Sequence, residues 1–255
     1  MLISVPRALL RLLSLIGLLF IGLAITFTVF PFVSRSEHER WIERWSGWLL
    51  AAAGMRLNLV GHIPDDPRGL LLVANHLSWI DIFVFNRVRA ARFVAKSEIA
   101  RWPVIGLLVA RVGTLFIERG RRHAVQHMLH TMAAHLERGE LVAVFPEGTT
   151  SDGRSLLPFH ANLIQAAIVT ATPVLPVALS FFDHLGRPSD APLFVGDTNL
   201  VQSVWRIISA PRLEARVQLL EPIPTHHDMR RVEVASIARQ RIGEALGLAP
   251  ETPAH

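Results

Sequence analysis

Residues 70–81 read LLLVANHLSWID, and this stretch decides the fold because a wholly apolar run passes directly into a polar cluster. An apolar run of this length without polar alternation is typical of a strand buried on both faces of a parallel sheet. Ligands of such sheets bind beyond the carboxyl ends of the strands. The polar cluster from Asn75 to Asp81 is therefore expected at a functional edge of the sheet.

Further apolar runs alternate with helical stretches from Leu57 onward. Strands are predicted at residues 57–60, 69–74, 92–95, 114–117, 141–145, 174–180 and 212–219. Helices are predicted at residues 80–88, 104–110, 122–137 and 161–170 and after residue 228, with a loop at residues 182–197. This alternation predicts an α/β fold with a largely parallel central sheet flanked by helices.

Composition limits the class of protein. A chain of 255 residues that is 51% hydrophobic suffices for one substantial domain with a short appendage. It contains no cysteine, which excludes disulfides, thiolate chemistry and cysteine-ligated metals. The net charge of +5 favours anionic partners, although an arginine-rich solvated surface explains it equally well. The arginines are scattered and not clustered with aromatic residues, so nucleic acid is not an expected partner.

The N-terminal segment is apolar enough to enter a membrane. Residues 12–33 carry no charge, and a helix rising ~1.5 Å per residue over this run would cross a ~30 Å hydrocarbon core. A signal peptide is less favoured, because no small-x-small cleavage site follows the run. The arginines that follow it, at positions 35, 40, 44 and 56, outnumber Arg7 and Arg11 before it. This bias predicts a cytoplasmic C-terminal body. A re-entrant segment in one leaflet fits the same residues.

A second helix is predicted at residues 36–53. Trp41, Trp45, Trp48 and Leu49 recur at helical spacing, with charged residues elsewhere around the turn. Such a helix can lie in the headgroup layer, or it can pack its apolar face on the core. The predicted organisation is residues 1–54 as a membrane helix plus an interfacial amphipathic helix, and residues 55–255 as the catalytic domain.

His76 and Asp81 form the first candidate constellation. They lie five residues apart, so they would not share a face of one continuous helix. His76 is therefore expected in the turn before a helix, where its ring can fold back onto the Asp81 carboxylate. That carboxylate would hold one tautomer and stabilise the imidazolium that forms when the other nitrogen takes a proton. The alternative is structural, with Ser78 as a helix cap and Asp81 complementing the helix dipole.

Polar residues also follow three other predicted strands. Glu147, Gly148 and Thr149 follow residues 141–145, Arg119 follows residues 114–117, and Lys96, the only lysine, closes residues 92–95. A carboxylate, hydroxyls and a glycine that permits close backbone approach suit a ligand site, although a polar turn has the same composition. The arginine could hold an anionic group bidentately or pair with a glutamate.

Four ordered segments resemble motifs of the glycerolipid acyltransferase family, which includes bacterial 1-acylglycerol-3-phosphate acyltransferases. They are residues 75–81 (NHLSWID, like NHxxxxD), 113–119 (GTLFIER), 145–149 (FPEGT) and 174–177 (VLPV). The resemblance covers residues 57–180, and its specificity comes from the order and spacing of four motifs. It implies acyl transfer from acyl-CoA or acyl-carrier protein to the free hydroxyl of a membrane lysolipid, at a bacterial inner membrane.

The resemblance also implies roles for single residues. His76 is the expected general base, assisted by Asp81, with no covalent acyl-enzyme, cofactor or metal. The residues expected to help bind the acceptor are Asn75, Lys96, Arg119, Glu147, Gly148 and Thr149. The expected acceptor is 1-acylglycerol-3-phosphate. However, many members acting on it read FPEGTR, and Thr150 stands in place of that arginine. Another lysolipid, such as lyso-ornithine lipid, is therefore the alternative acceptor, unless Arg154 substitutes.

Two other classes of function fit less well. A hydrolase would use Ser78 or Ser151 as nucleophile with His76 as its base, but the chain has no Gly-x-Ser-x-Gly elbow. The other is a basic membrane adaptor without enzymatic activity, which could also bind nucleic acid, but the scattered arginines give nucleic-acid binding little support.

Overall fold

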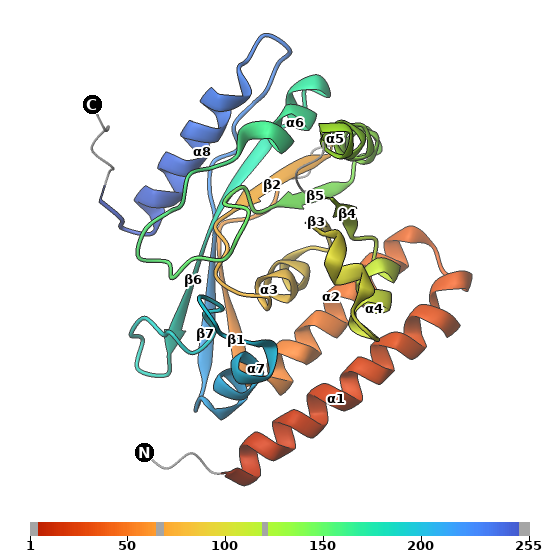
Figure 1. Ribbon diagram of the computed structural model, residues 1–255, viewed down its shortest axis with the longest axis vertical. Helices are drawn as coiled ribbons and strands as arrows, with labels where there is room; N and C mark the ends of the chain where they lie inside the picture. Colours follow the sequence, from red (N-terminus) through yellow and green to blue (C-terminus); the bar gives the residue numbers. More distant parts are fainter. Residues whose placement is uncertain (1–4, 65–68, 119–121, 250–255) are drawn as a thin grey trace.

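The computed structural model describes residues 5–64, 69–118 and 122–249. Its centre is a seven-stranded sheet of order β1-β7-β6-β2-β5-β3-β4 (Figure 1). The strands are β1 (Met55–Val60), β2 (Leu70–Ala74), β3 (Arg92–Lys96), β4 (Leu115–Ile117), β5 (Leu141–Val144), β6 (Val174–Asp183) and β7 (Leu213–Leu219). All seven coincide with predicted strands apart from shifts at their ends.

The sheet is parallel over its functional half. Strands β6, β2, β5, β3 and β4 are parallel neighbours, whereas β7 pairs antiparallel with β6 and parallel with β1. The carboxyl ends of β2, β5 and β3 therefore meet at one edge, as the sequence predicts for a largely parallel sheet.

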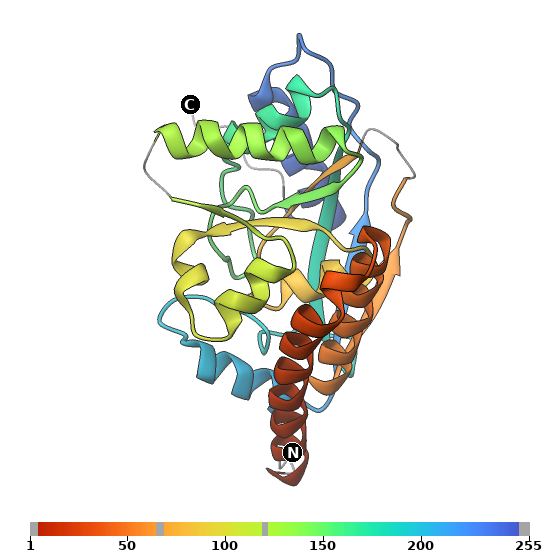
Figure 2. The same cartoon turned by 90° about the vertical axis from the view of Figure 1, so that its right-hand side faces the viewer.

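Helices cover both faces of the sheet, as Figures 1 and 2 show. One layer holds α1 (Val5–Thr28), α2 (Arg35–Ala52), α3 (Asp81–Val88), α4 (Ile105–Arg111) and α7 (Leu200–Ser209). The other holds α5 (Arg122–Glu137), α6 (Gln165–Val169) and α8 (Arg231–Ala245). Short 3-10 helices occupy Phe30–Phe32, Ser97–Arg101 and Ala161–Ile164.

Strand β2 shows why the sheet needs two layers of helices. All five of its residues are buried. Leu70 and Leu72 pack in the core beneath α2, α3 and α7, while Leu71 and Val73 pack in the core beneath α5, α6 and α8. Because side chains alternate between the faces of a strand, a continuous apolar run requires an apolar partner on each face.

Helix α7 lies where the sequence pattern predicts no element. Its N-cap is Asn199, whose side chain accepts a hydrogen bond from the Gln202 N–H at 2.9 Å, and the Gln202 side chain returns a contact to the Asn199 N–H. This Asn-x-x-Gln capping box is the local signal that identifies the start of the helix.

Helix α1 lies along the body of the protein, and its N-terminal end extends beyond it (Figures 1 and 2). It contacts α2, α4 and α7. The Arg11 guanidinium donates to the carbonyls of Ile208, Ala210 and Pro211 at the end of α7, at 2.6–3.1 Å. Helix α1 therefore begins before the uncharged run and includes Arg11.

The aromatic face of α2 packs mainly against protein. Trp45 is 7% exposed, packs with Leu49 and Leu108, and donates its indole N–H to the Leu18 carbonyl at 2.8 Å. Only Trp48 on this face is largely exposed. Part of this face is thus covered by α1, and the interfacial position predicted for residues 36–53 stays a prediction. The division at residues 54 and 55 falls at the start of β1 and stays a prediction.

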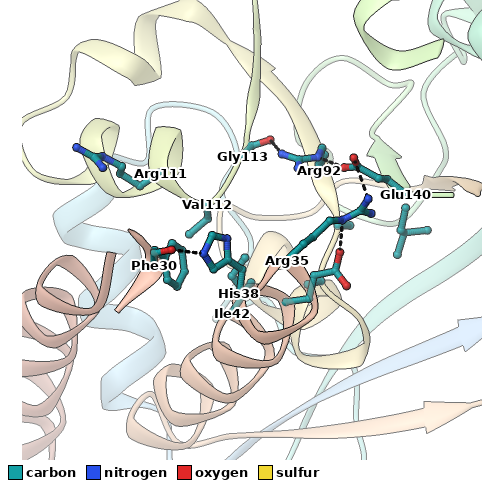
Figure 3. A pocket seen from close by; sticks show the side chains of 13 residues that line it. Phe30, Arg35, His38, Ile42, Arg92, Arg111, Val112, Gly113 and Glu140 are labelled. Carbon is teal, nitrogen blue, oxygen red and sulfur yellow. Dashed lines mark hydrogen bonds and ion pairs between the residues drawn. The ribbon is translucent and has the colours of Figure 1, made fainter. Parts of the chain in front are cut away.

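A small pocket lies between the α1–α2 turn and the amino ends of β3 and β5 (Figure 3). Its main polar feature is Glu140, a buried carboxylate that bonds to Arg92, to Arg35 at 3.2 Å and to His135 at 3.1 Å. These bonds outweigh the effect of burial, which alone would raise the Glu140 pKa, and hold that pKa below its usual value. The cluster joins α2 and α5 to the sheet at the edge opposite the carboxyl ends of the parallel strands.

Candidate active site

His76 occupies the turn between β2 and α3, as its spacing from Asp81 predicts. Its Nδ1 lies 2.8 Å from Asp81 Oδ2, and Asp81 is the first residue of α3. The His76 side chain is 19% exposed, whereas that of Asp81 is fully buried. A carboxylate at Nδ1 keeps the proton on that nitrogen and leaves Nε2 free to accept another.

The Asp81 carboxylate is fixed by its own turn. Oδ2 also accepts the backbone N–H groups of Leu77 and Ser78 at 2.7 and 2.8 Å. These donors bind the ionised form, which is the form needed to orient the imidazole. On its flat side the His76 ring stacks on Phe145, with ring centres 4.0 Å apart and an interplanar angle of 10°. The ring is therefore held by one hydrogen bond and one aromatic face.

Glu147 lies next to the same turn but faces its backbone. Its Oε1 accepts the His76 N–H at 2.7 Å, and its Oε2 accepts the Leu157 N–H at 3.0 Å. Burial raises the pKa of Glu147, although these hydrogen bonds act in the opposite direction.

Asn75 is fully buried at the end of β2. Its amide nitrogen donates to the Leu179 carbonyl at 2.9 Å, and its amide oxygen accepts the Leu179 N–H at 2.8 Å. The side chain thus extends the pairing between β2 and β6. Its contacts are with the protein backbone, so its expected binding role has no direct support in the geometry.

An open cleft of about 500 Å³ borders this turn at the carboxyl ends of β3 and β5. Lys96, Glu147, Gly148 and Thr149 line it, as does Phe145, whose ring stacks on His76. The exposed His160 is a further lining residue that the sequence does not single out. The structure therefore brings Lys96, Gly148 and Thr149 together, beside the His76–Asp81 pair.

Comparison with known proteins adds to this geometry. The sequence profile of the family described as "Acyltransferase" matches residues 58–180. A 1-acyl-sn-glycerol-3-phosphate acyltransferase from Neisseria meningitidis is 40% identical over 172 residues, covering 68% of this chain and 67% of that one. A lyso-ornithine lipid O-acyltransferase from Pseudomonas aeruginosa is 35% identical over 249 residues, covering 94% and 93%.

This chain belongs to the acyltransferase family. A solved structure supports the fold: the 1-acyl-sn-glycerophosphate (LPA) acyltransferase of Thermotoga maritima matches with a TM-score of 0.62. The match covers 96% of this chain and 100% of that one, at 22% identity. The α/β fold and the acyltransferase assignment made from the four motifs are both confirmed.

The sequence singles out three further positions of the acyltransferase as bearing on the acceptor, namely Arg119, Thr150 and Arg154. Arg119 lies outside the described residues, so its expected role stays a prediction. Thr150 donates its hydroxyl to the Phe194 carbonyl and so ties the Glu147 turn to the loop before α7. Arg154 lines a different cleft, near Asp190 at 3.8 Å, and is not among the residues that line the cleft with Lys96.

Ser78 and Ser151 of this acyltransferase do not form a nucleophile–base pair with His76 in the described part of the chain. Ser78 is fully buried, and its hydroxyl has no hydrogen-bond partner among the described residues. Ser151 directs its hydroxyl to the His76 backbone carbonyl at 3.4 Å. A serine nucleophile needs its hydroxyl within hydrogen-bond reach of the base, and neither residue meets this condition.

Proposed function

We propose that this lysolipid acyltransferase transfers a fatty acyl chain from a thioester donor to the free hydroxyl of 1-acylglycerol-3-phosphate, with His76 as general base. The observation that carries the proposal is the 2.8 Å contact between His76 Nδ1 and an Asp81 carboxylate that is itself bound by two backbone N–H groups. The motif-level resemblance and the relatives' activities support the same reaction.

The proton path follows from this pair. His76 Nε2 takes the proton of the acceptor hydroxyl as its oxygen attacks the thioester carbonyl, and Asp81 stabilises the imidazolium. When the tetrahedral intermediate collapses, the carbon–sulfur bond breaks. The departing sulfur then takes the proton from His76, giving the ester and the free thiol. The donor is acyl-CoA or acyl-carrier protein.

The acceptor headgroup fits the cleft beside this pair. Lys96 is exposed at the end of β3 and supplies a cation for an anionic group, while Gly148 and Thr149 line the same cleft. A lysine is a common partner of phosphate. The exposed cation and the polar lining of this cleft support 1-acylglycerol-3-phosphate as acceptor.

Lyso-ornithine lipid is the second candidate acceptor, and two observations favour it. Thr150 replaces the arginine of FPEGTR and uses its hydroxyl within the protein. The Pseudomonas relative with this activity also matches almost the whole chain.

A purified-enzyme assay tests both parts of the proposal. Free-thiol release from acyl-CoA is measured with each lysolipid in turn. His76→Ala should abolish turnover, whereas Ser78→Ala, which removes only a buried hydroxyl, should retain most of it. The reverse pattern would show a serine-dependent reaction. Turnover with lyso-ornithine lipid and none with 1-acylglycerol-3-phosphate would replace the first acceptor by the second.

The enzyme's membrane contact is proposed to lie along α1 without crossing the bilayer. Helix α1 exposes apolar residues along its length, among them Leu13, Ile16 and Phe20. Arg11, however, is held by α7 at a point 17 residues before the end of α1, a distance of about 25 Å. A spanning helix would carry Arg11 across most of a ~30 Å hydrocarbon core, away from those carbonyls. Helix α1 therefore lies in one leaflet, on the cytoplasmic side of a bacterial inner membrane.

A further inference from the structure

The backbone of the turn that carries His76 is held by a residue 71 positions away in the sequence. Glu147 is 4% exposed, and its two carboxylate oxygens accept N–H groups from two different segments. One donor is His76 itself, and the other is Leu157. Each oxygen thus accepts a backbone N–H of the protein itself, so the carboxylate is directed at the turn even though Glu147 also lines the open cleft.

We propose that Glu147 is a positioning residue for acyl transfer, which fixes the backbone of His76, and is not a residue that binds the acceptor. This inference rests on the proposed role of His76 as general base. It replaces the binding role that the resemblance implies for Glu147.

Neighbouring contacts fix the turn in the same way. The Ser151 N–H donates to the His76 carbonyl at 2.8 Å, so both backbone groups of His76 are bound by the turn after β5. The Phe194 N–H donates to the Leu77 carbonyl at 2.9 Å. A general base works only within hydrogen-bond reach of the proton it removes, so this bracing sets the catalytic geometry.

The chemistry of the contact explains why a carboxylate stands at position 147. Two N–H donors approach opposite oxygens, and only an ionised carboxylate presents an acceptor to each. A glutamine has the same shape but turns an NH₂ group toward one of the donors. A buried carboxylate beside His76 also adds negative charge near the imidazolium that forms during the reaction, in addition to Asp81.

The test compares Glu147→Gln with Asp152→Asn in the full-length enzyme. Asp152 is an exposed carboxylate in the same turn and serves as the matched control. The kcat and the KM for each substrate are measured with acyl-CoA and whichever lysolipid the wild-type enzyme accepts. In Glu147→Gln, kcat should fall about 10- to 100-fold, while both KM values stay within about threefold. Asp152→Asn should stay within about twofold of wild type in every constant.

A second readout needs no substrate. The imidazole signals of His76 in histidine-labelled, ligand-free enzyme are recorded by NMR and assigned with His76→Ala. A positioning role predicts that Glu147→Gln shifts the Nδ1–H signal and that Asp152→Asn does not. If Glu147 instead binds the acceptor, Glu147→Gln should leave the His76 Nδ1–H signal of the ligand-free enzyme unchanged.

Opposite results would overturn the inference. A large rise in the acceptor KM with kcat retained, together with an unchanged His76 signal, would make Glu147 a binding residue. If Glu147→Gln does not fold, as judged by thermal unfolding, Ser151→Ala takes its place, because it keeps the backbone N–H that binds His76 and removes the hydroxyl, which bonds to the Glu147 side chain and lies 3.4 Å from the His76 carbonyl. It should lower kcat a few-fold without raising the acceptor KM, and a raised KM counts against the inference. Full activity of His76→Ala would instead refute the proposed function, because that result does not depend on Glu147.

Discussion

At the residue scale, the site depends on which polar atoms remain free for a ligand. Asp81 Oδ2 bonds to the His76 ring and to the turn beside it, and Glu147 Oε1 accepts the His76 N–H. Asn75 has its amide directed at β6. Lys96 is exposed in the cleft. The polar atoms of Asn75 and Asp81 Oδ2 are thus bound within the protein, whereas the Lys96 side chain is open to a ligand.

Thr150 offers a test of specificity at this scale. Thr150→Arg places a guanidinium next to the cleft, where it can pair with a phosphate. We expect kcat/KM for 1-acylglycerol-3-phosphate to rise about 10-fold relative to that for lyso-ornithine lipid, which corresponds to about 1.4 kcal/mol. Competition between the two lysolipids, followed by lipid analysis, measures the ratio.

The matched control is Thr150→Val, which keeps the shape and removes only the hydroxyl bonded to Phe194. It should lower turnover of both lysolipids equally. If Thr150→Arg leaves the ratio of kcat/KM for the two lysolipids unchanged, position 150 does not contact the headgroup.

At the scale of elements, the cluster around Glu140 joins two layers of helices. Arg35 comes from α2, Arg92 from β3 and His135 from α5, and all three contact one buried carboxylate. Figure 3 shows the two arginines at this carboxylate. The side chains of Arg35 and Arg92 both reach solvent, so water can bind them when the carboxylate is lost. Loss of this carboxylate should therefore lower the stability of the protein without unfolding it.

Glu140→Gln should lower the free energy of unfolding by about 2 kcal/mol at pH 7, which is a fall in Tm of about 4–8 °C for a chain of this size. The folded-state pKa of Glu140 is depressed, so its contribution is present above the usual glutamate pKa and is lost as pH falls through the folded-state pKa. The difference in Tm between wild type and Glu140→Gln should therefore become smaller as the pH falls. Thermal melts from pH 7 to pH 3 measure this difference.

The control for this prediction is Glu39→Gln. It removes an exposed carboxylate that pairs with the same Arg35 at 3.0 Å, and it should change stability by less than about 1 kcal/mol. An equal loss in both variants, or a gap that persists in acid, would contradict the assignment to the buried carboxylate.

At the scale of the whole molecule, the question is how the body sits on the membrane. One helix, Val5–Phe32 with its 3-10 extension, is long and apolar enough to span by length and composition. Its docking along α2, α4 and α7 gives the body an apolar flank that can enter a single leaflet.

Cysteine labelling distinguishes the two arrangements, because the chain has no cysteine of its own. Val5→Cys marks the start of α1, and Asp228→Cys marks the exposed surface of the body. With a membrane-impermeant maleimide applied to intact spheroplasts, we expect neither to react, and after detergent solubilisation we expect both to react. If Val5→Cys reacts in intact spheroplasts and Asp228→Cys does not, α1 spans the bilayer.

The sequence by itself determined the parallel strands, the turn that pairs His76 with Asp81, and the family. These features depend on local signals: apolar runs, a five-residue spacing and short motifs. Helix α7 also had a local signal in its capping box, but a weak one.

Only the tertiary structure decided what each site residue contacts. Asn75 meets Leu179 across 104 positions, Glu147 meets the His76 backbone across 71, and Arg11 meets Ile208 across 197. Such contacts depend on strand order and register and on how helices dock. A local sequence pattern does not predict strand order, register or docking. A buried polar group can form its hydrogen bond with any backbone segment that folding brings within reach.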